Sequence, residues 1–276
     1  MGPTYAQLRL DLAAALAEFL DPQEAHAESL LWFEEGLGRS RTWLVAHGRE
    51  RIPDAERRRI SAWVRRRKTG EPWAYILGWT QWRQRRFEVN PDVLIPRPET
   101  ELLLKATLDL GWRLGVRRVV DVGTGSGILA VSLALETDWT VAATDLSPGA
   151  LAVARRNADA HGATVTFFEG DLLDPVPDPL PLVVSNPPYV DPAESPNLQR
   201  ELGFEPSLAL FAPDHGLALS TRLLQETRRR QAPACLLEIG AGQGAELVRR
   251  AQAAGWAAVD LQADFAGHDR ILIARA

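Results

Sequence analysis

Apolar residues recur at intervals of three and four over the first seventy positions, which is the pattern of helices that bury one face. The helices expected from this pattern are Tyr5–Leu20, Gln23–Glu35, a short one at Ser40–Ala46, and the basic Asp54–Lys68. Asp21-Pro22 separates the first two, and Thr69-Gly70 ends the last. Residues 1–70 are therefore expected to form a small helical domain.

The pattern changes after residue 70. Two runs rich in aromatic and apolar residues, Trp73–Trp79 and Trp82–Val89, predict a β-hairpin with Gly78 and Thr80 in its turn region. From Pro98 onward, short apolar runs alternate with helical patterns, which is typical of a doubly wound parallel sheet. The sequence thus predicts a helical domain over 1–70, a β-hairpin linker over 71–97 and an α/β domain over 98–276.

The first strand of the expected sheet leads into a glycine-rich turn. The apolar run over residues 116–121 ends in Asp121, the turn has the spacing Gly-x-Gly-x-Gly, and an apolar helix begins at Ile128. Glycines let the backbone approach a ligand closely, and a helix N-terminus favours a carboxylate or phosphate. The alternative is an ordinary crossover turn of an α/β sheet without a ligand.

Acidic residues follow the next two strands. Asp145 ends the strand over 139–144, and an acid about 20 residues past such glycines typically binds a ribose diol. Asp171 and Leu172 follow the strand over 164–168, where a carboxylate can accept a hydrogen bond from an adenine amino group, although a turn-capping role for Asp is common. A dinucleotide fingerprint would have Gly-x-Gly-x-x-Gly, so S-adenosylmethionine fits better than NAD, with Asp121 facing its ammonium group.

The cofactor site expected from these patterns combines the glycine turn, the strand-end acids and one residue from a later loop. Its members are Asp121, Gly123, Thr124, Gly125, Ser126, Gly127, Asp145, Asp171, Leu172 and Asn186.

The later loop is Asn186-Pro187-Pro188-Tyr189, which follows the apolar run over residues 180–185. Both prolines have a fixed φ and no N–H, so the loop is stiff and its carbonyl oxygens can face a ligand. Asn adds an acceptor oxygen and Tyr adds a flat ring, which together suit a planar amino group. The alternative is a proline-rich turn that only ends a strand.

A second glycine-rich turn, Gly240–Gly244, follows the strand that ends at Glu238. No second Asn-Pro-Pro-Tyr loop comes after it. We interpret this segment as a strand-to-helix turn of the same sheet and not as the cofactor site.

Together, these motifs resemble those of class I methyltransferases, and four further stretches narrow the resemblance. They are Pro72–Gly78, Leu94–Glu101, Glu205–Leu210 and Gly267–Arg270. From about Glu24 to the C-terminus, the chain is similar to the protein-(glutamine-N5) methyltransferase family of the PrmC/HemK type. The resemblance implies a Rossmann-like domain with a mainly parallel seven-stranded sheet, preceded by a small helical domain that docks the substrate.

The family resemblance also implies the reaction. Its members transfer a methyl group from S-adenosylmethionine to the glutamine amide of the Gly-Gly-Gln loop in class I peptide-chain release factors, leaving S-adenosylhomocysteine. Asn186, Pro187 and Tyr189 are then the expected catalytic residues. Substrate is expected to contact these residues, Pro188, Arg97 and Glu99. A helix start with acids in its first turn explains Glu99 equally well.

Three alternatives remain open from the sequence. A sister group of the family modifies a glutamine of a large-subunit ribosomal protein. An adenine N6 methyltransferase would use a similar clamp for a planar amino group on nucleic acid. A cofactor-binding scaffold without activity is the third, although a scaffold has no need of Asn186.

Composition and charge limit the partners. Residues 98–276 carry an excess of acidic side chains, which disfavours a tight grip on duplex DNA, so nucleic acid is not expected as the direct substrate. Residues 39–68 are strongly basic and suit either an acidic partner or a solvated helix face. The one cysteine, the five scattered histidines and the lack of a long apolar run predict no metal, no membrane span and a cytoplasmic setting. Nothing requires more than a monomer.

Overall fold

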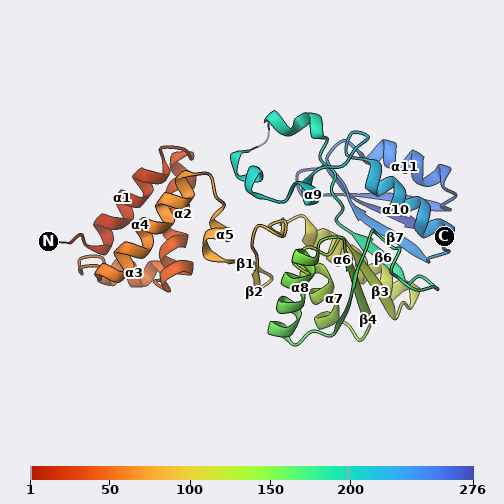
Figure 1. Ribbon diagram of the computed structural model, residues 1–276, viewed down its shortest axis with the longest axis horizontal. Coiled ribbons are helices and arrows are strands. Elements are labelled where there is room, and N and C mark those ends of the chain that lie inside the picture. The colour runs from red at the N-terminus through yellow and green to blue at the C-terminus, as the bar shows by residue number, and fades with distance from the viewer. Residues whose placement is uncertain (1, 198) are drawn as a thin grey trace. The chain divides into compact units, whose positions relative to one another are not determined.

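The chain divides into two units, Met1–Gly78 and Trp79–Ala276, in the computed structural model, which describes residues 2–197 and 199–276 (Figure 1). The helices of the first unit are α1 (Tyr5–Leu16), α2 (Pro22–Leu31), the π-helical turn η1 (Trp32–Gly36), α3 (Arg41–His47), α4 (Asp54–Lys68) and α5 (Trp73–Leu77). Side chains of Thr4, Asp21 and Ser40 cap the first, second and third α-helices by accepting backbone N–H groups. Each cap fixes a helix start close to the position expected from the sequence.

Aromatic residues hold the helical unit together. The fully buried Trp32 stacks on Trp73 at a ring separation of 4.6 Å and meets the edge of Trp63 at 6.0 Å. The guanidinium of Arg67 is also buried, and its Nε donates to Glu28 Oε1 at 2.8 Å. The unit therefore has its own apolar core, with the one buried charge of α4 paired.

The expected strand over Trp73–Trp79 is wrong, because these residues form α5 instead. Pro72 precedes the helix, and Gly78, with φ of 86°, ends it in the left-handed conformation. Trp73 donates to Glu35 at 2.9 Å, so tertiary packing within the helical unit wins over its strand propensity. The hairpin lies further on, as β1 (Trp79–Trp82) and β2 (Arg85–Glu88).

The turn of the hairpin carries no glycine. Arg83 and Gln84 both adopt positive φ, 42° and 64°, as a two-residue hairpin turn requires. Trp82 donates from its indole to Ser132 at 3.2 Å, and Phe87 is fully buried in the core of the second unit. The hairpin is thus anchored to the α/β unit by its apolar side chains.

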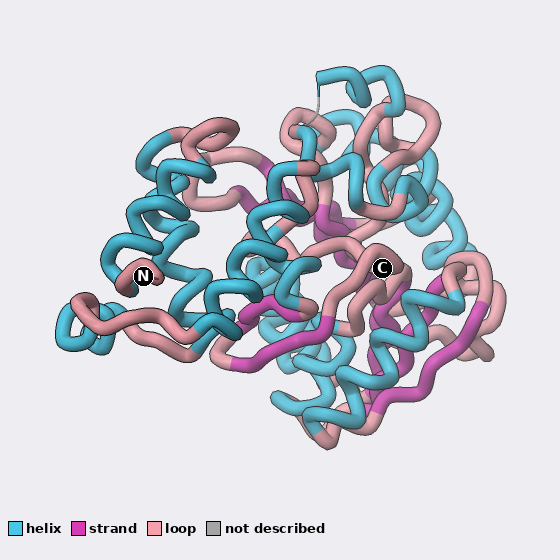
Figure 2. The backbone as a smooth tube through the Cα atoms, turned by 60° about the vertical axis from the view of Figure 1, so that its left-hand side comes forward, coloured by secondary structure: helices cyan, strands magenta, loops and turns pink. Residues whose placement is uncertain are grey.

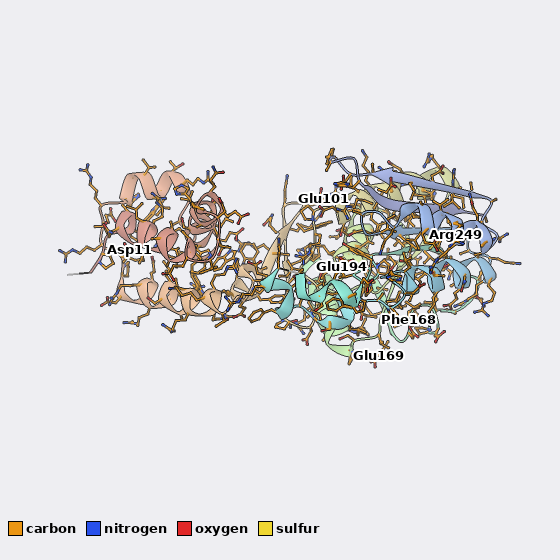
Figure 3. The ribbon with its side chains drawn as sticks, turned by 90° about the horizontal axis from the view of Figure 1, so that it is seen from above. Asp11, Glu101, Phe168, Glu169, Glu194 and Arg249 are labelled. Atoms are coloured by element: carbon orange, nitrogen blue, oxygen red, sulfur yellow. The ribbon has the colours of Figure 1, made fainter. Side chains whose placement is uncertain are left out.

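The second unit is built on a seven-stranded sheet with the order β5-β4-β3-β6-β7-β9-β8. The strands are β3 (Arg118–Val122), β4 (Thr140–Asp145), β5 (Val165–Glu169), β6 (Leu182–Ser185), β7 (Ala234–Glu238), β8 (Ala258–Ala263) and β9 (Asp269–Arg275). All neighbours from β5 to β7 are parallel, and β9 runs antiparallel to both β7 and β8. The mainly parallel, doubly wound sheet is confirmed. Figure 3 shows Phe168 and Glu169 together at the border of the unit, where β5 forms the sheet edge.

Helices cover both faces of the sheet (Figure 2). One face carries α6 (Thr100–Leu114), α7 (Ile128–Glu136) and α8 (Pro148–His161); the other carries α10 (Ala218–Arg229) and α11 (Gly244–Ala253) (Figure 1). In β3, Val119 belongs to the apolar core on the side of α6 and α7, and Val120 and Val122 belong to the core on the side of α10 and α11. Strands buried on both faces explain the continuous apolar runs in the sequence.

The topology reverses direction between β3 and β6. From β3 the chain proceeds outward through β4 to β5, and then returns to place β6 on the other side of β3. In open α/β sheets, ligands bind at the carboxyl ends of the strands beside such a reversal. The carboxyl ends of β3 and β6 carry the glycine turn and the Asn-Pro-Pro-Tyr loop.

A long excursion connects β6 to the second half of the sheet. It contains the short helices η2 (Pro192–Asn197), η3 (Arg200–Phe204) and α9 (Ser207–Leu210). Val190 and Phe211 form a parallel bridge at its base. None of the helices in the described part of the chain has the length and hydropathy needed to span a bilayer.

Candidate active site

The glycine turn after β3 leaves space above its backbone. Gly123 and Gly125 have φ of 70° and 54°, and a Cβ added at either would meet no atom within 4 Å. Gly127 differs, because a Cβ there would lie 2.9 Å from the Cβ of Ala154 in α8. The first two glycines therefore open the turn toward a ligand, and the third allows close packing of α7 on α8.

The two strand-end acids hold the turn in shape. Asp145 Oδ2 accepts from Gly125 N at 2.9 Å, and its Oδ1 accepts from Ser147 N at 2.9 Å. Asp121 Oδ2 accepts from the Thr124 hydroxyl at 2.7 Å and from Ala130 N at 3.2 Å. Both carboxylates retain lone pairs for a ligand, because an ionised carboxylate offers about four acceptor positions.

Burial changes the acidity of these groups. Asp121 is 2% exposed, and burial raises its pKa to about 7, although Thr124 and Ala130 oppose the rise. Burial also raises the pKa of Asp145 above its usual value. Among the described residues no cationic side chain pairs with Asp121. A buried carboxylate without a cation is well suited to a ligand ammonium group.

Asp171 and Leu172 close the cavity beside β5. Asp171 pairs with Arg222 of α10, at 2.9 Å between Oδ2 and the guanidinium. Leu172 has φ of 46°, and its carbonyl accepts from the buried Thr144 hydroxyl at 2.9 Å. The hydrogen bond fixes an uncommon backbone conformation at the cavity wall.

Asn186 follows β6 and faces α6. Its Nδ2 donates to the Thr100 hydroxyl at 3.2 Å, and Thr100 donates in turn to Glu238 at 2.8 Å. An amide that uses its nitrogen in this way has its oxygen free to accept from a ligand. Pro187 is buried, whereas Pro188 and Tyr189 are partly exposed.

The second glycine-rich turn is hydrogen-bonded to the Asn-Pro-Pro-Tyr loop. Gln243 Nε2 donates to the Tyr189 carbonyl at 2.9 Å, and its Oε1 accepts from Gly240 N at 2.9 Å. The Tyr189 hydroxyl points to Glu238 Oε1 at 3.5 Å, and burial raises the pKa of Tyr189 to about 12. Neither turn residue lines the cavity, in agreement with the structural interpretation of this segment.

Arg97 and Glu205 tie the two walls of the cavity together. Glu205 is 6% exposed, and it accepts from the Arg97 guanidinium at 2.6 Å and from Ile95 N at 3.2 Å. The neighbours of this pair, Pro96 on one side and Pro206 on the other, both line the cavity. No mechanism for Glu205 was predicted from the sequence; in the structure it joins two segments that line the cavity.

Ten of the residues expected at the site line one cavity. They are Asp121, Gly123, Thr124, Gly125, Ser126, Asp145, Asp171, Leu172, Asn186 and Pro188. Five others stand behind or beside the lining, namely Gly127, Pro187, Tyr189, Arg97 and Glu99.

The contacts of three supporting residues were not predicted from the sequence, although Thr100 lies in the Leu94–Glu101 stretch that carries the family resemblance. Thr100 and Glu238 connect to Asn186 through their side chains. Asn157, which is buried in α8, donates to the Ser126 carbonyl at 2.8 Å and to the Glu88 carbonyl at 3.0 Å, so it joins the glycine turn to β2. Glu238 carried a signal of its own, since it ends a buried strand before a glycine-rich turn, much as Asp121 lies near the end of β3.

Replacing Gly216 by alanine is expected to distort the Asn-Pro-Pro-Tyr loop. Gly216 has φ of 81°, and an added Cβ would lie 2.0 Å from the Tyr189 carbonyl oxygen. We expect a loss of about 1 to 3 kcal/mol in unfolding free energy and a lower turnover number. Denaturant unfolding and steady-state kinetics measure the two effects.

Gly162→Ala is the matched control for this prediction. Gly162 also has positive φ, 67°, but a Cβ there meets no atom within 4 Å, and it lies at the end of α8. The control should lose some stability through its backbone conformation while keeping its turnover number. Equal turnover in the two variants would contradict the steric argument.

Comparisons with known proteins agree with this geometry. The methyltransferase small domain family matches residues 98–210, and the PrmC N-terminal domain family matches residues 9–78. The release factor glutamine methyltransferase of Bordetella pertussis is 40% identical over 256 residues, covering 91% of this chain and 95% of that protein. The protein of the same name from Neisseria gonorrhoeae is 42% identical, covering 86% and 88%.

The chain belongs to the release factor glutamine methyltransferase family. The resemblance inferred from the sequence motifs is therefore confirmed, and the α/β unit is a methyltransferase domain. Among solved structures, the catalytic domain of human hMettl16, in complex with the MAT2A 3′UTR hairpin 6, has a TM-score of 0.58. It is 15% identical and covers 79% of this chain and 80% of that one, a likeness that concerns the fold.

S-adenosylmethionine suits the groups around the cavity. The open glycine turn lets a ligand approach the protein backbone closely. Asp121, which pairs with no cation among the described residues, matches an ammonium group, and the Asp145 carboxylate has lone pairs left for a ribose diol. As a methyl donor, S-adenosylmethionine also fits a methyltransferase domain.

Proposed function

We propose that the protein transfers the methyl group of S-adenosylmethionine to a glutamine side chain. The acceptor is the amide nitrogen of the Gly-Gly-Gln glutamine in class I peptide-chain release factors. The observation that carries the proposal is the orientation of the Asn186 amide. Its nitrogen donates a hydrogen bond to Thr100, which leaves its oxygen for a ligand, and Asn186 lines the same cavity as the glycine turn. Relatives named release factor glutamine methyltransferase, at about 40% identity over most of the chain, support the choice of substrate.

The chain's own residues would orient the acceptor nitrogen. S-adenosylmethionine supplies an electrophilic methyl group when it is bound. The Asn186 Oδ1 atom and the Pro187 carbonyl accept the two N–H bonds of the substrate amide, which directs the nitrogen lone pair away from them. An amide nitrogen is a weak nucleophile because its lone pair is delocalised, so correct orientation supplies much of the rate enhancement.

The same acceptors stabilise the charge that develops. The substrate nitrogen becomes positive as it is methylated, and preorganised oxygen dipoles favour that charge. Tyr189 packs against the amide plane, while Arg97 and Glu99 contact the substrate chain at the entrance. Glu238 is buried and its oxygens accept from Thr100 and Tyr189, so the departing amide proton passes to water.

The helical unit is proposed to dock the substrate. We assign this role to residues 1–70 and methyl transfer to residues 98–276; of the expected linker over 71–97, residues 71–78 belong to the helical unit and the hairpin belongs to the α/β unit. Exposed arginines of α4, among them Arg58 and Arg65, offer positive charge to an acidic protein surface. A cytoplasmic monomer would meet release factors where translation terminates.

A transfer assay with methyl-labelled S-adenosylmethionine tests the proposal. Purified release factors, large ribosomal subunits and DNA are offered in parallel, and mass spectrometry locates the label. Label on the Gly-Gly-Gln glutamine is the expected result. Label on a ribosomal glutamine or on adenine, with none on the release factor, would replace the proposed substrate.

A further inference from the structure

Glu238 is a buried carboxylate with no role in the chemistry described so far. It ends β7, is 1% exposed, and lies behind the cavity wall. Its Oε2 accepts from the Thr100 hydroxyl at 2.8 Å, and Thr100 accepts from Asn186 Nδ2 at 3.2 Å. A continuous chain of hydrogen bonds therefore runs from Glu238 to the amide that would hold the substrate.

The direction of these hydrogen bonds follows from the number of protons that each group carries. A threonine hydroxyl has one proton, and an ionised carboxylate can only accept. When Thr100 gives its proton to Glu238, it can only accept from Asn186, so the Asn186 nitrogen must face Thr100. The Asn186 oxygen is then left for the substrate, as the amide clamp needs.

Protonation of Glu238 would remove this constraint. A neutral carboxyl can donate its proton to Thr100, which frees the threonine proton to point at Asn186. Asn186 would then turn its oxygen toward Thr100 and present its NH2 group to the substrate. The NH2 groups of Asn186 and of the substrate glutamine would then face each other, and the substrate amide would lose a hydrogen-bond acceptor.

We propose that Glu238 is a positioning residue, which acts through Thr100 to hold the Asn186 amide with its oxygen toward the substrate, and which releases that amide when it is protonated. The inference rests on the proposed glutamine methylation and adds the group that sets the direction of its clamp. Glu238 touches neither substrate nor cofactor in this arrangement.

The surroundings of Glu238 place its titration in a useful range. Burial raises the pKa of Glu238 to about 7, and the hydrogen bond from Thr100 opposes this rise. Glu99 raises it further, whereas Arg270, from β9, and the Tyr189 hydroxyl lower it. Arg270 is itself paired with Asp264 at 2.9 Å, and Arg97 and Glu99 act on the neighbouring Tyr189.

The sign of the pH effect is definite. Below the pKa, Glu238 is neutral and Asn186 is free to turn, so the turnover number should fall as the pH drops through about 7. Glu238→Gln cannot titrate, and its side-chain amide can either accept from Thr100 or donate to it, so it no longer fixes the direction of Asn186. This variant should lose the acid limb of its kcat profile and have a lower kcat than the wild type at alkaline pH.

Thr100→Val tests the connection itself. Valine has nearly the shape of threonine and no hydroxyl, so Asn186 loses its partner. We expect kcat to fall by about 10- to 100-fold, while the dissociation constant for S-adenosylmethionine stays within about twofold. Thr100→Ser restores the hydroxyl and should recover most of the turnover.

Thr107→Val is the matched control. Thr107 is buried in the same helix, and its hydroxyl donates to the Leu103 carbonyl at 2.7 Å, away from the cavity. The same substitution there should leave kcat unchanged. A similar loss in both variants would show that damage to α6, and not the link to Asn186, lowers the rate.

A second readout does not depend on activity. The ¹⁵N side-chain amide resonance of Asn186, followed by NMR in the protein without substrate, should titrate near pH 7 in the wild type. The titration should vanish in Glu238→Gln and in Thr100→Val. A resonance that does not titrate, or that titrates equally in all three proteins, would overturn the proposal.

The two hypotheses fail in different ways. If the wild type transfers no label to a release factor glutamine, the proposed substrate is wrong whatever Asn186 does. If the wild type transfers label, and Thr100→Val has the wild-type kcat and pH profile, the positioning role of Glu238 is wrong while the substrate stands.

Discussion

Replacing Asn186 by alanine is expected to lower kcat for methyl transfer by about 100- to 1,000-fold. The variant lacks the side-chain oxygen that would accept from the substrate amide, so the acceptor nitrogen is neither oriented nor stabilised as it becomes positive. The glycine turn and its acids remain, so the dissociation constant for S-adenosylmethionine should stay within about twofold. Single-turnover transfer to a release factor and calorimetric cofactor titration measure the two quantities.

Asn186→Gln is the informative partner of this variant. It keeps the amide but moves it by one methylene, so a positional mechanism predicts a loss nearly as large. Near-wild-type turnover in Asn186→Ala would show that the amide clamp is wrong. Loss of cofactor binding in step with turnover would instead make Asn186 a cofactor ligand.

The second large effect is expected at Asp121, where Asp121→Asn should weaken S-adenosylmethionine binding by about 10- to 100-fold. Asparagine has the same shape and can still accept from Thr124 and Ala130, but it has no charge for the ammonium group. Burial raises the pKa of Asp121 to about 7, so the wild type should bind the cofactor more weakly as the pH falls below about 7. The ammonium group of a bound cofactor lowers the pKa of Asp121, so the affinity for the cofactor should fall gradually as the pH is lowered.

Titration calorimetry between about pH 5.5 and 8.5, roughly 1.5 units either side of the pKa, separates this effect from others. The wild type should show the pH dependence, and Asp121→Asn should not. Asp138→Asn changes the net charge equally at an exposed position, where Asp138 pairs with Arg117, and should bind like the wild type. Unchanged affinity in Asp121→Asn would remove Asp121 from the cofactor site.

Much of the fold was predictable because its signals are local. The strands of the parallel sheet are buried on both faces, so they stand out as apolar runs, and glycines or acids mark their carboxyl ends. Asp121, Asp145 and Asn186 each follow such a run, and strand topology then brings them to one cavity. The roles of these residues stay predictions until they are tested.

The remainder depends on contacts between residues far apart in sequence. The Thr100–Glu238 hydrogen bond and the Arg97–Glu205 pair each join positions more than one hundred residues apart. No spacing rule connects them. Trp73 shows the same limit: its run has strand-like composition, and its contacts with Trp32 and Glu35, about forty residues earlier in the sequence, favour a helix there.

The bridge between Val190 and Phe211 closes the excursion after β6 into a loop whose ends are held together. Its two ends are held together by hydrogen bonds from Val190 N to Leu210 O and from Ala212 N to Val190 O. Doubling the length of such a closed loop costs only about 0.6 kcal/mol. A change in the length or sequence of this excursion should therefore alter the cavity wall formed by Pro206 and Leu208 and leave the strands of the sheet as they are.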